Sequence, residues 1–165
     1  MSPYSRNLFG EELLPETKRI ILRKIESRYQ KEVVREDAPA WVNLRFTAPA
    51  QVFEMFLGLR QATKEHFITL HLDGKNRITC YDPVSVGSLN QAIVHPREVF
   101  SNAVRSSAAA ILLIHNHPSG DPKPSREDLE ITRRLKEAGE LLGIKVLDHI
   151  IIGDSYLSFV EQGYL

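Results

Sequence analysis

The chain has 165 residues, of which 42% are hydrophobic and 25% are charged, a composition typical of one globular domain with its own core. Its 21 basic and 21 acidic residues balance, which argues against strong nonspecific binding to nucleic acid. The single cysteine, Cys80, rules out a disulfide within the chain and is expected to be a small packed residue. No run approaches the roughly 20 apolar residues of a membrane span, and residues 1–16 lack a signal-peptide pattern. We therefore expect a cytoplasmic protein with no membrane partner.

The first 40 residues differ in character from the rest. Residues 14–34 are highly charged, and their apolar residues recur at roughly helical spacing, which predicts an amphipathic helix. Residues 35–40 read as a linker. We expect a helical N-terminal extension over residues 1–40 and a main domain over residues 41–165.

The main domain alternates between helix and strand patterns. Helices are expected over residues 48–62, 96–107 and 125–143, and strands over residues 65–72, 77–82, 108–117 and 144–153. A turn at Asp73-Gly74, with the positive dihedrals that such turns need, is expected between the first two strands. Residues 155–165 are expected to form a short strand or a final turn. The order of these elements predicts an α/β fold with interleaved helices and strands.

The helix expected over residues 125–143 has the clearest pattern. Ser125 and Asp128 resemble a capping box at its start, and Gly143 is a C-terminal stop. Its apolar face is expected to consist of Leu129, Ile131, Leu135, Ala138 and Leu142. Taken alone, Ser125 and Asp128 read as a plain helix cap.

Two histidines at the end of the strand over residues 108–117 suggest a metal site. His115 and His117 are two residues apart, so both imidazoles point to the same face of the sheet and converge there. A catalytic zinc ion usually takes three protein ligands and keeps one position open. Asp128 is the preferred third ligand because a helix start holds it firmly; Asp121 and His71 are weaker alternatives. Two packed or surface histidines are the competing interpretation.

The remaining candidates are expected to have structural roles. Asn116 lies between the two histidines but points away from them, so it is left out of the site. His95 is expected to pack or to cap a helix. His149 lies on a strand and is expected to be structural, with a supporting role beside the site as the alternative.

These residues carry a family resemblance. In "HNHPSGDPKPSRED", H-x-H is followed by seven residues and then S-x-x-D, which resembles the JAMM signature of the JAB/MPN metalloproteases. The flanking stretches "KEHFITLHLDGKNRI", "VHPREVFSNAV" and "LDHIIIG" resemble the bacterial RadC proteins, traditionally labelled DNA repair proteins. The resemblance covers about residues 43–165. A contiguous His-Asn-His tripeptide does not indicate an HNH nuclease, because those three residues are scattered along a ββα unit.

The resemblance implies a fold and a set of roles. The fold would be a curved mixed β-sheet flanked by helices, similar to cytidine deaminase. His115, His117 and Asp128 would bind one zinc ion, Glu65 would move the proton of the attacking water, and Ser125 would stabilise the oxyanion. From pattern alone, nothing links Glu65 to the histidines. Related JAB enzymes cleave peptide or isopeptide bonds, often next to ubiquitin-like modifiers.

A zinc-dependent peptidase or isopeptidase acting on an unidentified protein or peptide is therefore the leading hypothesis. A DNA-repair-associated nucleic-acid-binding module and a non-catalytic interaction scaffold are the alternatives. The first 40 residues contain one glycine, Gly10, and are not expected to form the helix-hairpin-helix region that RadC proteins carry before the JAB domain. The chain lacks the long insertions with which eukaryotic relatives grip ubiquitin, so a ubiquitin substrate does not follow. The sequence gives no indication of the oligomeric state.

Overall fold

The computed structural model describes residues 22, 23, 26, 28–87 and 94–165, and divides the chain into the units 1–30 and 31–165. About half of the predicted helix over residues 14–34 lies outside the described residues. Residues 28–34 are described, and there the prediction is wrong because they form no helix. All seven are exposed, so no apolar face is buried to stabilise helical structure. The domain boundary expected at residue 40 stays a prediction.

Five strands form one mixed sheet in the unit 31–165. Its order is β2-β1-β3-β4-β5; β3 and β4 are parallel, and every other neighbouring pair is antiparallel. The bounds are β1 Glu65–Leu72, β2 Ile78–Gly87, β3 Ala110–Asn116, β4 Lys145–Ile152 and β5 Tyr156–Ser158. The four expected strands are thereby confirmed, although β2 extends beyond residue 82 to Gly87.

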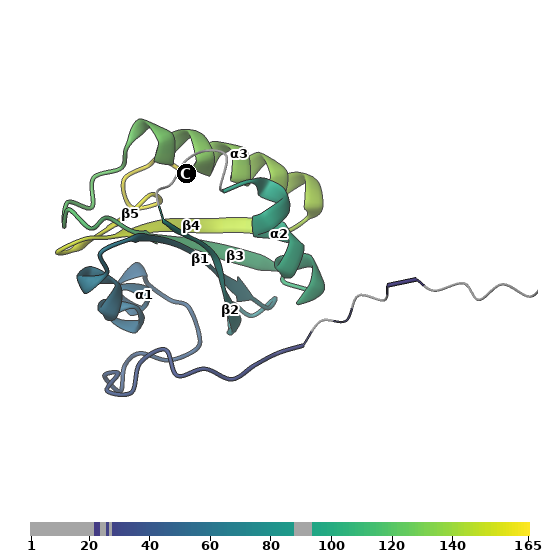
Figure 1. Cartoon of the computed structure of the whole chain (residues 1–165), viewed down its shortest axis with the longest axis horizontal. Helices are drawn as coiled ribbons and strands as arrows, with labels where there is room; N and C mark the ends of the chain where they lie inside the picture. The colour runs from purple at the N-terminus through teal and green to yellow at the C-terminus, as the bar shows by residue number, and fades with distance from the viewer. Residues whose placement is uncertain (1–21, 24–25, 27, 88–93) are drawn as a thin grey trace, which may run out of the picture. The chain divides into compact units, whose positions relative to one another are not determined.

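Helices cover both faces of this sheet (Figure 1). The helix α1 (Pro49–Met55) packs on one face through Val52, and α2 (Pro96–Arg105) and α3 (Arg126–Leu142) pack on the other. The helix expected over residues 48–62 is interrupted at Phe56 and continues as a 3₁₀ turn, η1 (Leu57–Gln61). The fold is thus an α/β domain with a mixed sheet flanked by helices, as the sequence and its resemblance predict. None of the helices in the described part of the chain is both long and apolar enough to cross a membrane.

The ends of α3 are as predicted, and its expected apolar face is confirmed at Ile131, Leu135 and Ala138, which pack in the core. Ser125 is the N-cap, and Gly143 ends the helix in the left-handed conformation, with φ 71°. The prediction is wrong at Leu129 and Leu142, which are 40% and 50% exposed. The buried positions are Asp128, Ile131, Thr132, Leu135 and Gly139. Two polar side chains, those of Asp128 and Thr132, therefore lie on the buried face of α3. Both have hydrogen-bond partners.

The turn between β1 and β2 is also built differently from the prediction. Asn76, with φ 58°, and not Asp73-Gly74, supplies the positive dihedral. The Asp73 carboxylate accepts the backbone N–H groups of Lys75 and Arg77 at 2.8 and 3.0 Å. These bonds stabilise a turn followed by a left-handed residue, the usual form of a three-residue hairpin loop.

We predict that Gly139→Ala destabilises the protein, although alanine is normally the better helix former by about 1 kcal/mol. A Cβ at Gly139 would lie 2.4 Å from the backbone oxygen of Ile144, which is too close for the two segments to stay in place. We expect a loss of about 1–3 kcal/mol in the free energy of unfolding, measured with urea. Gly58→Ala is the control, because its Cβ would meet nothing within 4 Å. Equal stability of the two variants would contradict the prediction.

Candidate metal centre

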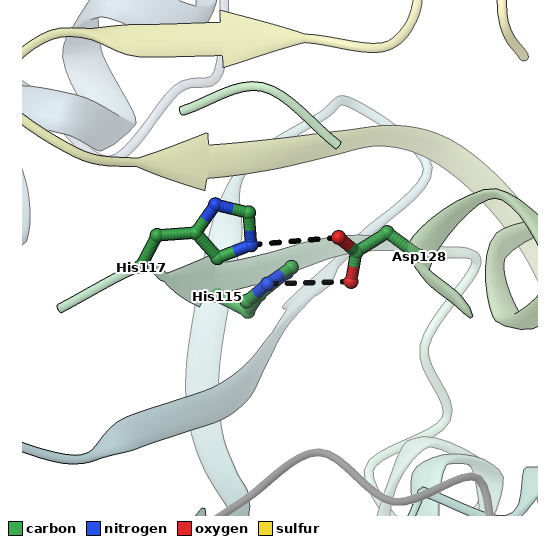
Figure 2. A group of neighbouring side chains, drawn as sticks. All are labelled: His115, His117 and Asp128. Carbon is green, nitrogen blue, oxygen red and sulfur yellow. Dashed lines mark ion pairs between the residues drawn. The ribbon is translucent and has the colours of Figure 1, made fainter. Parts of the chain in front are cut away.

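A strand end and a helix start bring three side chains together (Figure 2). His115 lies near the end of β3, His117 follows that strand, and Asp128 is in the first turn of α3. One candidate ligand atom from each residue lies within 4.8 Å of the other two. The two Nε2 atoms, of His115 and His117, are each 3.4 Å from an oxygen of the Asp128 carboxylate. The structure therefore brings together the three residues that were expected to bind a metal.

A chain of hydrogen bonds fixes the tautomer of His115. The Thr132 hydroxyl donates its one hydrogen to the backbone oxygen of Asp128 at 2.6 Å, so it must accept the N–H of His149 Nδ1, also at 2.6 Å. His149 Nε2 is then an acceptor, and His115 Nδ1 donates to it at 3.0 Å. A neutral His115 consequently carries no hydrogen on Nε2. Among the buried side-chain nitrogen and oxygen atoms in the described residues, only this Nε2 has no hydrogen-bond partner.

A loop fixes the tautomer of His117. Its Nδ1 donates to the backbone oxygen of Asp121 at 2.7 Å, because a carbonyl can only accept, and this leaves a lone pair on Nε2 of the neutral ring. The loop is held against the end of β4, where the Asp154 N–H donates to the Gly120 oxygen at 2.7 Å. A Cβ at Gly153 would lie 2.2 Å from that oxygen, so a glycine is required for this close approach.

The charges of the three residues point to a cation between them. Burial lowers the pKa of His115 to about 4, and burial also holds the pKa of His149 well below its ordinary value. The hydrogen bond that protonated His117 donates to the Asp128 carboxylate raises the pKa of His117. Burial opposes ionisation of Asp128, but His117, the charge of His115 and the bonds from Ser125 together lower its pKa. Two imidazole lone pairs facing a carboxylate repel one another unless a positive charge lies between them. A proton on His117 supplies one such charge, and a metal ion held by all three residues would supply another.

The two expected catalytic residues lie beside this cluster. Glu65 is the first residue of β1 and, with His117, lines a cleft of about 720 Å³. Its charge contributes to the raised pKa of His117. Ser125 is exposed, and its hydroxyl donates to Asp128 Oδ2 at 2.7 Å while accepting the Asp128 N–H at 3.1 Å. The cap interpretation of Ser125 is therefore confirmed, and in this arrangement its hydroxyl hydrogen is already used.

The other candidates have different partners. His71 lies among Thr69, Ser106 and Cys80, with its Nδ1 2.8 Å from the Ser106 hydroxyl, so the structure does not bring it to the cluster. Asp121 contributes its backbone oxygen to His117, while its carboxylate accepts the Lys123 N–H. His95 caps α2 by accepting the Arg97 N–H, as expected.

Two residues have closer connections to the site than the sequence pattern indicated. His149 bonds directly to His115, so its supporting role was the better alternative. Asn116, which was left out, bonds with its side chain to the backbone on both sides of Glu65. Strand alternation alone does not reveal such a contact, because the partners are some 50 positions apart in the sequence.

The mixed sheet and its His-His-Asp cluster define a class of α/β domain with a candidate metal centre at a strand end. The family model described as "RadC-like JAB domain" matches residues 46–164, and the chain belongs to this family. Proteins named "UPF0758 protein" from Trichlorobacter lovleyi and Geotalea uraniireducens are 73% and 69% identical to the chain over 123 residues. Another with the same name, from Methanosarcina mazei, is 52% identical over 123 residues. The matches cover 73% of this chain and 54% of each relative, so the chain spans about half the length of these curated relatives.

We predict that His117→Asn destabilises the metal-free protein in a pH-dependent way. The pKa of His117 is raised on folding, so its stabilisation is complete below about pH 6.5 and is lost as the pH rises through the raised pKa. The pKa of Asp128 is lowered, so its stabilisation is complete above about pH 3.9 and is lost as the pH falls. The loss caused by the substitution should therefore be largest between these two values.

Urea unfolding in the presence of a chelator would measure this effect. His95→Asn is the matched control, because His95 caps α2 and does not face Asp128, and that variant should keep the pH dependence of the wild type. A loss from His117→Asn that is equal at about pH 5 and about pH 8.5 would rule out the ion pair as its cause.

Proposed function

We propose that this domain binds one zinc ion through His115, His117 and Asp128 and hydrolyses peptide or isopeptide bonds. The observation that carries the proposal is the set of three electron-pair donors that face one another with no hydrogen between the neutral imidazoles and the carboxylate. Two imidazole nitrogens and one carboxylate oxygen suit zinc, and three protein ligands leave the open position typical of a catalytic site. The bond from His149 to His115 is the kind of support that orients a metal-binding histidine.

Zinc bound here would supply a Lewis acid that polarises the scissile carbonyl and lowers the pKa of the attacking water. Glu65 would accept the proton of that water and deliver it to the leaving amine. It suits this role because Glu65 and His117 line the same cleft. Ser125 would donate its hydroxyl hydrogen to the developing oxyanion. This requires the hydroxyl to turn from Asp128 Oδ2, with which it is bonded in the structure.

The substrate class follows from the same proposal. We infer a protein or peptide whose scissile bond enters the cleft lined by Glu65 and His117, with conjugates of ubiquitin-like modifiers as one class to test. The nucleic-acid-binding and scaffold alternatives stay predictions.

The first test of the proposal is metal binding. After removal of metal with a chelator, we expect the wild type to take up about one zinc ion per chain. His117→Ala should lose more than the 10–100-fold in affinity that is typical of removing a supporting partner, because it removes a ligand. His95→Ala is the matched control and should bind zinc as the wild type does, since His95 caps α2. Titration with competing chelators would measure both, and a wild type that binds no zinc would refute the proposal.

The second test concerns the proton carrier. Glu65→Gln should retain zinc but lower kcat by about 10²–10⁴-fold, because the amide cannot accept the proton of the attacking water. Glu127→Gln makes the same change at an exposed position next to Asp128 and should hydrolyse as the wild type does. Hydrolysis of a peptide library by zinc-loaded protein gives the rates. Full activity of Glu65→Gln would exclude this residue as the base.

A further inference from the structure

The side chain of Asn116 is a buried amide that joins two strands at the edge of the site. The residue is 0% exposed and is the last residue of β3. Its Oδ1 accepts the backbone N–H of His66 at 2.8 Å, and its Nδ2 donates to the backbone oxygen of Lys64 at 3.1 Å. Both ends of the amide are therefore satisfied, and the two partners are the peptide groups on either side of Glu65.

The position of this amide follows from the pairing of β1 with β3. The two antiparallel strands pair from Leu72↔Ala110 to Phe67↔His115, where the register ends. Counting one step further sets His66 opposite Asn116, and two steps further sets Glu65 opposite His117. The Asn116 side chain thus bonds to β1 where the next backbone pair would otherwise be. It holds the start of β1 to the end of β3 beyond the last paired residues.

Strand alternation sets Glu65 on the same face as the candidate ligands. Phe67 and His115 are paired, and their rings stack with centroids 6.2 Å apart, so they share one face of the sheet. Glu65 is two residues before Phe67, and His117 is two residues after His115, so both continue on that face. The two residues line the same cleft. A shift of β1 relative to β3 at this edge would therefore change the distance from Glu65 to the cluster.

We propose that Asn116 is a positioning residue, which fixes the backbone at Glu65 relative to His115, His117 and Asp128. This inference rests on the proposed function, since it assigns to Asn116 the placement of the proposed base. The position requires a donor and an acceptor on one short planar group, and asparagine provides both. Aspartate lacks the donor, and alanine lacks both, so either would release one or both peptide groups that flank Glu65.

The chain offers a matched control for the loss of a buried amide. Gln51, in α1, is 3% exposed; its Oε1 accepts the Thr47 N–H at 2.7 Å, and its Nε2 donates to the Arg45 oxygen at 3.1 Å. Gln51→Ala therefore removes a comparable pair of bonds from another part of the fold, together with those that Oε1 accepts from the Thr47 hydroxyl and the Ala48 N–H. Both Asn116→Ala and Gln51→Ala should lower the urea midpoint of unfolding, but only the former should change catalysis.

The kinetic experiment uses the zinc-loaded full chain and a double-mutant cycle. Asn116→Ala should lower kcat by about 10²-fold, the loss typical of a misplacement of about 1 Å, with KM and zinc affinity close to those of the wild type. In the Glu65→Gln background, Asn116→Ala should lower kcat little further, because residues that act as a unit are not additive. An equal fold-loss in both backgrounds would overturn the proposal. So would a fall in zinc affinity that accounts for the lost activity, because Asn116 would then act through the ligands.

Asn116→Asp keeps the size of the side chain and its bond from His66, so it guards against a failure of Asn116→Ala to fold. It should also lower kcat in the wild-type background and add little in the Glu65→Gln background. If it leaves kcat unchanged, the donor to Lys64 has no positioning role and the proposal fails.

Amide hydrogen exchange separates this proposal from the proposed function, since it needs no substrate. The His66 amide should exchange several-fold faster in Asn116→Ala, and Gln51→Ala should accelerate the Thr47 amide while leaving that of His66 unchanged. Unchanged exchange at His66 in Asn116→Ala would show that the side chain does not hold β1. A wild type that hydrolyses neither peptide nor isopeptide bonds would refute the proposed function alone.

Discussion

Two imidazole lone pairs that face one carboxylate are the constraint on which the rest of the site depends. The arrangement is unfavourable without a positive charge between the groups, and yet the surrounding bonds enforce it from three sides. Thr132 and His149 orient His115, the Asp121 oxygen orients His117, and Ser125 holds Asp128. Such supporting bonds restrict each ring to one tautomer and one orientation before any ion binds. A histidine cluster that served only to fill the core would also give His115 Nε2 a hydrogen-bond partner, which this atom lacks.

The fold supplies these supports from elements that are distant in the sequence. The parallel pairing of β3 with β4 sets His149 beside Leu113, on the strand next to the one that carries His115 near its end. The helix α3 then returns over this face and presents Asp128 and Thr132 on consecutive turns. The loop between β3 and α3 packs against Gly153, which follows β4. In this position the loop presents the Asp121 oxygen to His117. Each supporting group therefore comes from the β3-α3-β4 unit and needs no additional element.

Local rules predict much of this site, and long-range pairing explains what they miss. Alternation along a strand sets His115 and His117 on one face, and the capping pattern sets Asp128 at a helix start, so both follow from short stretches of sequence. Glu65 could not be linked to them by pattern, because its place depends on how β1 pairs with β3; only the family resemblance indicated it. Asn116 was missed for the same reason. The exposed Leu129 and Leu142 show a further limit: apolar periodicity did not indicate that the polar residues Asp128 and Thr132 share the buried face of α3 with Ile131 and Leu135.

The double use of Asp128 would couple the proposed metal binding to the start of α3. Its Oδ2 accepts from both the N–H and the hydroxyl of Ser125, and the same carboxylate faces both histidines. A ligand that binds only the folded state stabilises it, and here the stabilisation would reach the helix through its cap. If Ser125 turns its hydroxyl toward a substrate, Asp128 keeps the bond from the Ser125 backbone, at 2.6 Å. In the proposed reaction, the cap would therefore release its hydroxyl hydrogen while the backbone bond keeps the carboxylate in place.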